Sequence, residues 1–206
     1  MAIVVSILYK PNKSIFMKNL ILLFIAVFFF SCSKSDSVTK SYFEQNPLQG
    51  YLSISRFEER KDAYLGSYPT RESGFSFIPN VNGKINAIIA ALPYDYPDLR
   101  VTVWDKASST VLRTEIINVT TPGTNIVKQI EPINLQKDKE YVLSYNVKNW
   151  YRHEKQLSGD ATYPIVVNDI KITGFYYSVT TAQLIPSTIV NKYYDGDCTF
   201  NFLQTE

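Results

Sequence analysis

The stretch Tyr141–Lys148, with the sequence YVLSYNVK, carries the alternation that decides the fold. Its odd-numbered positions are aromatic or aliphatic, whereas Ser144, Asn146 and Lys148 are polar or charged. Successive side chains of an extended chain point to opposite faces, so this pattern predicts a β-strand with one face in a core and the other toward water. We therefore expect a half-buried strand over these residues.

The segments around this stretch repeat the pattern. In Arg100–Asp105 two valines alternate with a threonine and a tryptophan. Lys84–Leu92 is apolar on both faces, as in a central strand, and although a helix is the alternative, the hairpin signal Asn82-Gly83 before it favours a strand. Further strands are expected at Val111–Thr120, Asn125–Ile133, Ile165–Thr173, Gly174–Ser178 and Asp197–Leu203.

These segments together predict the fold class. About eight or nine short strands, separated by turn residues and without a convincing amphipathic helix, are typical of an all-β fold. We expect an antiparallel β-sandwich, jelly-roll-like in its connections, that forms a single domain over residues 50–206. A long loop from Trp150 to Tyr163 is expected to follow the strongest strand.

The segment Met17–Cys32, MKNLILLFIAVFFFSC, predicts where the protein is located. A lysine, an apolar run over Leu20–Phe30 and a small residue precede the cysteine, which is the order of a secretory signal peptide. At about 1.5 Å per residue, the run is too short to cross a hydrocarbon core of about 30 Å. Its end, FFSC, resembles the lipobox of bacterial lipoproteins, which implies cleavage before Cys32 and lipid attachment to Cys32. A plain signal peptide and a buried apolar helix are the alternatives.

This interpretation assigns residues 1–31 to a lipoprotein signal peptide, with translation starting at Met17, and makes the bacterial outer membrane a partner through N-terminal acyl chains. Whether the domain faces the periplasm or the cell surface stays open. Residues 32–49 are rich in serine and lack apolar periodicity, which predicts a flexible tether.

Charge and cysteine usage of the mature chain follow from the same assignment. The leader contains three lysines and no acid, so the rest of the chain is close to neutral, which argues against a nucleic-acid partner. Cys198 is the only other cysteine, and it is left unpaired when Cys32 carries lipid. We expect Cys198 to be a buried thiol on a strand.

Several short segments form a series between residues 74 and 203. They are GFSF at 74–77, NGKI at 82–85, VTVWD at 101–105, YVLSY at 141–145, GFYY at 174–177, IP at 185–186 and KYY at 192–194. This series resembles the uncharacterised bacterial β-sandwich modules known as domain of unknown function 4082. The resemblance implies a jelly-roll-like, non-catalytic module of secreted bacterial proteins, often beside adhesive or carbohydrate-related domains. The loop YDYP at 94–97 departs from the glycines and threonines usual in that family, which leaves any ligand open.

Catalytic and metal chemistry has few candidate residues. The chain has one histidine, His153, in a polar stretch without a nucleophile motif, so we expect a solvated loop side chain and no hydrolytic triad. One histidine and one free cysteine cannot form a zinc site. We therefore expect no enzyme activity, no catalytic residue and no cofactor. Calcium binding stays open for five aspartates that turn formation also explains, which are Asp95, Asp98, Asp160, Asp195 and Asp197.

Aromatic residues are the one surplus, with 15 Tyr and 12 Phe. Trp150 and Tyr151 open the expected long loop, and Tyr94 and Tyr96 lie in a proline-bounded turn. Flat aromatic faces in sandwich loops stack on sugar rings, so these four are the candidate ligand-binding residues. The alternative is that they close the open ends of the sandwich.

These observations predict a lipid-anchored, non-enzymatic binding or adhesion module of the cell envelope, with carbohydrate as the candidate ligand. The alternative is a structural or accessory subunit of an envelope protein complex, which would use an exposed strand edge or loop patch. A hydrolase is the least favoured function.

Overall fold

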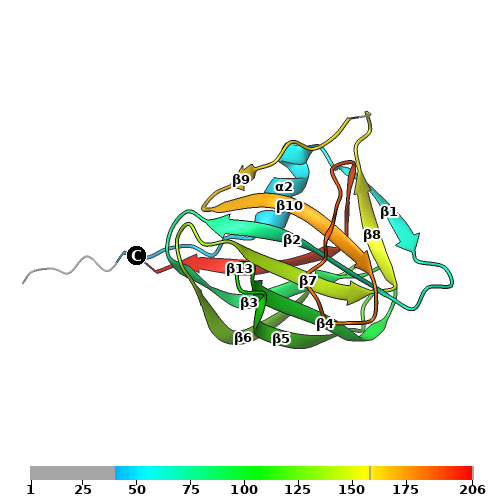
Figure 1. Cartoon of the computed structure of the whole chain (residues 1–206), viewed down its shortest axis with the longest axis horizontal. Helices are drawn as coiled ribbons and strands as arrows, with labels where there is room; N and C mark the ends of the chain where they lie inside the picture. The colour runs from blue at the N-terminus through cyan, green and yellow to red at the C-terminus, as the bar shows by residue number, and fades with distance from the viewer. Residues whose placement is uncertain (1–39, 158, 206) are drawn as a thin grey trace, which may run out of the picture. The chain divides into compact units, whose positions relative to one another are not determined.

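The computed structural model describes residues 40–157 and 159–205, which form one helix and thirteen strands (Figure 1). The expected signal peptide, the start at Met17 and the lipid site Cys32 lie outside the described residues. The elements are α2 (Pro47–Ser55), β1 (Glu59–Tyr64), β2 (Arg71–Pro79), β3 (Gly83–Ala91), β4 (Tyr96–Asp105), β5 (Thr110–Val119), β6 (Ile126–Leu135), β7 (Tyr141–Val147), β8 (Asn149–Glu154), β9 (Ile165–Val167), β10 (Ile170–Val179), β11 (Thr188–Ile189), β12 (Tyr193–Asp195) and β13 (Asp197–Gln204).

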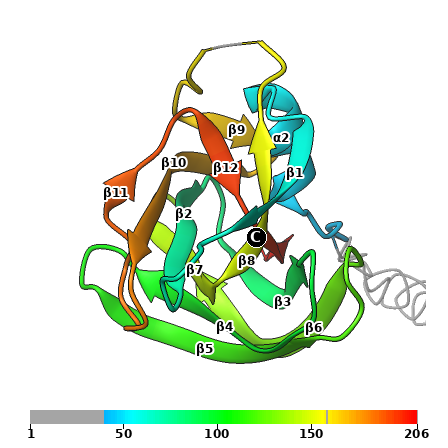
Figure 2. The same cartoon turned by 90° about the vertical axis from the view of Figure 1, so that its right-hand side faces the viewer.

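The strands form three antiparallel sheets. The largest has the order β11-β10-β2-β7-β4-β5, with β9 also paired to β10, and the other two are β13-β3-β6 and β1-β8-β12. Figure 2 shows β5 and β6 along the lower margin, where the largest sheet and the β13-β3-β6 sheet both end. The expected all-β antiparallel sandwich is confirmed. The strands outnumber the expected eight or nine because several contain only two or three residues.

The core lies between the seven-stranded sheet and the β13-β3-β6 sheet. Phe77 of β2 and Phe200 of β13 place their ring centroids 4.7 Å apart, and Phe75 stacks on Phe200 at 6.1 Å. Alternate residues of each strand enter this layer, so Cys198 and Phe202 are buried on the same face as Phe200. The expectation that Cys198 is a buried free thiol on a strand is confirmed.

The ordered domain begins before residue 50. Gln45 forms an isolated antiparallel bridge with Phe202, and α2 begins at Pro47. Asn46 caps this helix because its side chain accepts a hydrogen bond from the Leu48 N–H, and proline is well suited to a first helical position. The expected tether is therefore too long at its C-terminal end, and the expectation of no helix was wrong. The described chain contains no helix with the length and apolarity to cross a bilayer.

Three strand expectations also need correction. The stretch expected as a loop after β7 contains β8, which pairs with β1 on one side and β12 on the other. The strand expected over Ile165–Thr173 is interrupted because Asn168 adopts a φ of 51° and turns the chain between β9 and β10. Every residue of β7 is buried, rather than one face only, because a later segment covers its polar face.

Candidate functional site

The outer face of the seven-stranded sheet carries polar residues in register across neighbouring strands. Arg100 of β4 is opposite Asn146 of β7, which in turn is opposite Glu72 of β2. In the next row, Thr102 of β4 is opposite Ser144 of β7. Directly opposed residues of paired strands lie on the same face, so these side chains meet although they are far apart in sequence. They have the parity opposite to the core-facing residues of the same strands.

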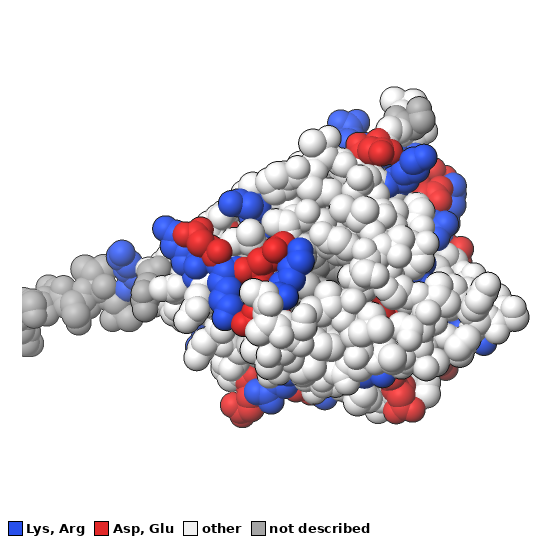
Figure 3. Space-filling model, viewed as in Figure 1, with Lys and Arg blue, Asp and Glu red and all other residues white. Residues whose placement is uncertain are grey.

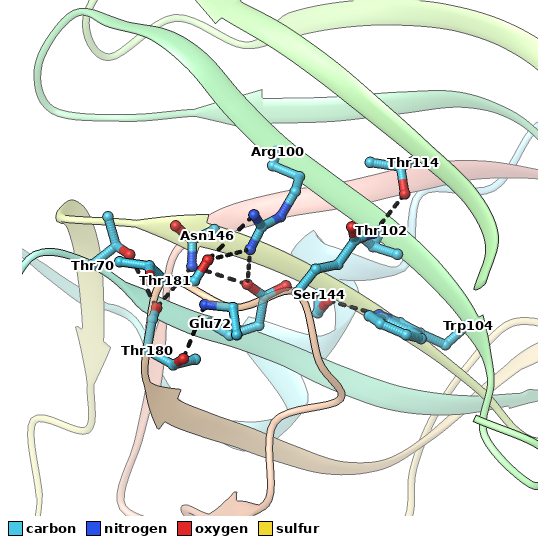
Figure 4. A network of polar contacts seen from close by, with 12 residues as sticks. Thr70, Glu72, Arg100, Thr102, Trp104, Thr114, Ser144, Asn146, Thr180 and Thr181 are labelled. Carbon is cyan, nitrogen blue, oxygen red and sulfur yellow. Dashed lines mark hydrogen bonds and ion pairs between the residues drawn. The ribbon is translucent and has the colours of Figure 1, made fainter. Parts of the chain in front are cut away.

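Glu72 is the centre of this network (Figure 4). Its Oε1 accepts a hydrogen bond from Ser144 Oγ at 2.8 Å, and its Oε2 accepts from Asn146 Nδ2 and Arg100 Nη2, each at 3.0 Å. The indole Nε1 of Trp104 donates to Ser144 Oγ at 2.9 Å, which extends the network along β4. The carboxylate is inaccessible to solvent, whereas the Arg100 side chain reaches the surface.

Residues 180–183, which we call the cover segment, cross this face after β10 (Figure 4). The Thr180 carbonyl oxygen accepts hydrogen bonds from Asn146 Nδ2 at 3.1 Å and from Thr70 Oγ1 at 3.0 Å. The Thr181 carbonyl oxygen accepts from Arg100 Nη1 and Nη2, each at 3.4 Å. Gln183 Nε2 donates to Thr102 Oγ1 at 3.0 Å and to Thr114 Oγ1 at 2.6 Å. The sheet face thus holds carbonyl and amide groups of its own chain. The same donors and acceptors suit the hydroxyl and amide groups of a ligand.

The other end of the outer face is more open. Glu140 Oε1 accepts from Thr173 Oγ1 at 2.6 Å and from Lys106 Nζ at 2.9 Å, and Thr173 Oγ1 lies 2.6 Å from Ser76 Oγ. Lys106 Nζ is 5.3 Å from the ring centroid of Tyr176, which is partly exposed. Figure 3 shows cationic and anionic side chains gathered at the left end of this face, with uncharged residues over most of the rest. This end offers a donor, an acceptor and an aromatic ring to solvent.

The pKa values of Glu72 and Glu140 are shifted in opposite directions from the ordinary value of 4.5. Burial raises the pKa of Glu72 above 4.5 and outweighs the lowering by its hydrogen bonds from Ser144, Arg100 and Asn146. Burial also raises the pKa of Glu140, but there the hydrogen bonds from Thr173 and Lys106 prevail and the pKa lies below 4.5. The stability contribution of Glu72 is therefore present at low pH and lost as the pH rises through its folded-state pKa, and that of Glu140 is lost as the pH falls.

We expect Glu72→Gln and Glu140→Gln to alter the pH dependence of stability with opposite signs. Relative to Glu72→Gln, the free energy of unfolding of the natural chain should fall as the pH rises above 4.5. Relative to Glu140→Gln, it should fall as the pH drops below 4.5. Each slope is bounded at about 1.4 kcal/mol per pH unit, since one proton is involved. Urea titrations at a series of pH values measure both slopes, and two slopes of the same sign would contradict the assignment.

A second polar cluster joins the β1-β8-β12 sheet to the largest sheet. Asp195 of β12 pairs with Arg71 Nη1 of β2 at 2.9 Å and accepts from Arg152 Nε of β8 at 2.8 Å. The Arg71 guanidinium lies between the rings of Trp150 and Tyr177, 4.6 and 4.3 Å from their centroids. Arg71 and Asp195 are both buried, so Trp150 serves this internal stack.

The four predicted ligand-binding aromatics do not share one exposed rim. Trp150 and Tyr151 are only 2% and 7% exposed, whereas Tyr94 is 52% exposed and Tyr96 is partly buried. The ring of Tyr151 also lies under the Arg60 guanidinium, 4.2 Å from its centroid. Trp150 and Tyr151 are therefore buried and offer no flat face to a sugar.

The solvated loop position expected for His153 was wrong. His153 lies on β8, is buried, and contacts an Asp197 carboxylate oxygen through Nε2, while Arg60 Nη1 lies 3.7 Å from the other oxygen. Asp195 and Asp197 are thus used in internal ion pairs rather than in open turns. In the part of the chain that the structure describes, no group of three or more His, Cys, Asp or Glu could hold a metal ion.

Sequence reasoning did not single out Glu72, Arg100 and Asn146. A signal was present for Arg100 and Asn146, because both are polar and occupy the parity opposite to core residues on an expected strand, whereas no strand was expected at Glu72. What the sequence lacked was the order of the strands in the sheet, which alone brings the three together.

Comparison with known proteins assigns no family, since no family model and no curated protein matches the chain. The resemblance to domain of unknown function 4082 stays a prediction. The ligand is accordingly inferred from the chemistry of the surface itself.

Proposed function

We propose that the chain is a non-enzymatic binding or adhesion module of the bacterial cell envelope, anchored through lipid on Cys32, and that it binds carbohydrate. The observation that supports this most is the outer face of the seven-stranded sheet. Hydrogen-bonding side chains lie there beside Tyr176, whose ring is partly exposed. Sugars need such a combination, because their hydroxyls pair with polar groups and their C–H faces pack on aromatic rings.

The open end of this face is the proposed contact region. Tyr176 provides the ring, Glu140 an acceptor and Lys106 a donor, and all three side chains are partly exposed. Tyr176 is held in place because β10 pairs with β2 on one side and with β11 on the other. The paired strand thus presents the Tyr176 ring with a low ordering cost on binding, and Lys106 and Glu140 lie next to the ends of β4 and β7, which favours a shallow site for a glycan chain.

Tyr176→Ala is expected to weaken glycan binding about tenfold, equivalent to about 1.4 kcal/mol, because it removes the ring on which a sugar packs. The full chain in detergent is first applied to an array of envelope and host glycans, and the best ligand is then titrated by calorimetry. Tyr68→Ala is the matched control, since Tyr68 is an exposed tyrosine on the segment between β1 and β2. An array without signal, or an equal loss in both variants, would remove the proposal.

A structural or accessory subunit of an envelope complex is the second candidate. It is favoured by one observation, the exposed apolar side chains on β5 and β6, which are Val111, Leu112, Ile116 and Val127. Apolar groups gathered at a sheet edge mark protein contacts more often than glycan contacts. Co-purification of an envelope protein that is lost on Ile116→Lys would favour this function over the first.

A further inference from the structure

β5 is a long strand with one free edge. It pairs with β4 over most of its length, and no other strand of the described chain pairs with it. Figure 2 shows it at the lower margin beside β6. The exposed fractions of the apolar side chains there are 43% for Val111, 38% for Leu112, 45% for Ile116 and 51% for Val127. An unpaired edge with exposed apolar side chains is a template for another strand.

The sequence of β5 is complementary to itself about Thr114. Residues 111–117 read VLRTEII, so positions equidistant from Thr114 carry a matched pair of charges or a matched pair of aliphatic groups. If a second copy pairs antiparallel about a twofold axis at Thr114, Arg113 lies opposite the partner copy's Glu115. Leu112, the extra residue of an irregularity in the pairing with β4, then lies near the partner copy's Ile116. Opposite charges and apolar pairs directly across a ladder are stabilising, and each of these pairs occurs twice.

Other registers lose this match. A shift by one residue moves every β5 side chain of one copy to the other face relative to its partner, and the charged residues then oppose threonine or aliphatic groups. The register centred on Thr114 is thus the one in which Arg113 lies opposite Glu115 and aliphatic residues lie opposite each other.

Arg113 has an unmet charge in the single chain. Its Nε is buried without a hydrogen-bond partner, and no carboxylate of the described residues pairs with it. Glu115, by contrast, holds Lys128 Nζ of β6 at 2.8 Å. A buried guanidinium nitrogen without a partner is costly, so an acid supplied from outside the chain would stabilise Arg113.

Lys128 occupies a backbone hydrogen-bonding position on the free edge of β5, which limits pairing with unrelated strands. Its Nζ donates to the Ile116 carbonyl oxygen at 2.9 Å, which places a charge across the free edge. Charges of this kind protect a sheet edge from indiscriminate pairing. A strand that offers backbone N–H groups together with complementary side chains can replace the bond that Lys128 gives up, whereas an unmatched strand cannot.

We infer that the chain forms a symmetric homodimer in which the β5 strands of two copies pair antiparallel about Thr114. The interface is isologous, so the same residues serve both copies and the assembly closes at two. The dimer joins the two largest sheets into one and displays two outer faces together. This goes beyond the proposed function, since it holds for any ligand, and paired sites would raise avidity for a repetitive one.

The first test is crosslinking of Thr114→Cys in the full chain in detergent, with a short thiol-reactive crosslinker. Opposed Cα atoms of an antiparallel pair lie about 4.5–5.5 Å apart, so the two introduced thiols are within reach of each other and a dimer band is expected. Thr110→Cys is the control, because the two copies of residue 110 would lie about 27 Å apart at about 3.4 Å per residue. The natural chain gives the background, since Cys198 is buried. Equal dimer yields from both variants, or none from Thr114→Cys, would overturn the inference.

The second test reverses the charges in the Thr114→Cys background. Arg113→Glu places like charges opposite each other twice and should lower the crosslinked yield at least tenfold, and adding Glu115→Arg should restore it. Lys61→Glu on β1, a charge reversal on an edge strand of another sheet, should leave the yield unchanged. Circular dichroism of each variant verifies folding. A folded Arg113→Glu chain that crosslinks as before, or a folded double variant that does not recover, would contradict the register.

Discussion

Asp195→Ala is expected to lower the free energy of unfolding by about 3–5 kcal/mol. The substitution leaves the buried Arg71 guanidinium without its counter-charge, and the Nε and Nη2 of Arg71 already lack partners within the described chain. It also releases Arg152, so β12 loses its side-chain ion pairs to both β2 and β8. For a domain of this size the melting temperature should fall by roughly 6–20 °C. Urea unfolding followed by tryptophan fluorescence measures the loss, because Trp150 stacks on Arg71.

Two further variants test whether the loss of stability comes from the buried Arg71–Asp195 pair rather than from removing any charged side chain. Lys61→Ala removes an ion pair whose partners are largely solvated, so its effect on the free energy of unfolding should be a small fraction of the Asp195→Ala loss. Arg71→Ala combined with Asp195→Ala should cost at least about 1 kcal/mol less than the sum of the single variants, since neither charge is then buried alone. A loss for Asp195→Ala as small as that for Lys61→Ala would show that the pair is not desolvated as the structure has it.

The period-two pattern located the strands that enter the core, because burial of one face is a local property of the sequence. β7 was located to within one residue from Tyr141–Lys148, and β13 within one residue from Asp197–Leu203. The prediction of a half-buried β7 was wrong because the cover segment, which lies far along the chain, contacts Asn146, and because Ser144 is hydrogen-bonded between Glu72 and Trp104. A pattern within one strand cannot register such a contact.

β8 could not be recognised by the same rule. Its residues Arg152 and His153 are read as loop residues in the sequence, since charged side chains are seldom buried. In the fold they meet Asp195 and Asp197, which lie about forty residues later and hydrogen-bond with them. Long-range polar contacts therefore support a partly buried strand where the sequence predicts a loop, and Trp150 on that strand is buried.

The candidate site was likewise predictable only in its local features. The sequence indicated that strands would carry polar residues on one face, but the meeting of Glu72 with Arg100 depends on the strand order β2-β7-β4, which no spacing in the sequence encodes. The self-complementary residues of β5 are the opposite case, since their symmetry is visible in the sequence and only the exposed edge had to come from the structure.

Phe200→Ala is expected to cost about 3–5 kcal/mol of the free energy of unfolding. Phe200 is fully buried and contacts Phe77 and Phe75 across the layer between the seven-stranded sheet and the β13-β3-β6 sheet. Neighbouring rings of this size, fixed on a strand of another sheet, cannot move far enough to fill the space, so a cavity term adds to the lost burial.

Phe200→Leu and Phe43→Ala determine whether that loss reflects the layer between the sheets. Leucine keeps most of the volume of the Phe200 side chain, so Phe200→Leu should cost about 1–2 kcal/mol. Phe43 is 72% exposed, and Phe43→Ala should change the free energy of unfolding by no more than about 0.5 kcal/mol. Urea unfolding of the three variants gives the order directly. If Phe200→Ala and Phe200→Leu cost the same, the ring does not fill a rigid layer between the seven-stranded sheet and the β13-β3-β6 sheet.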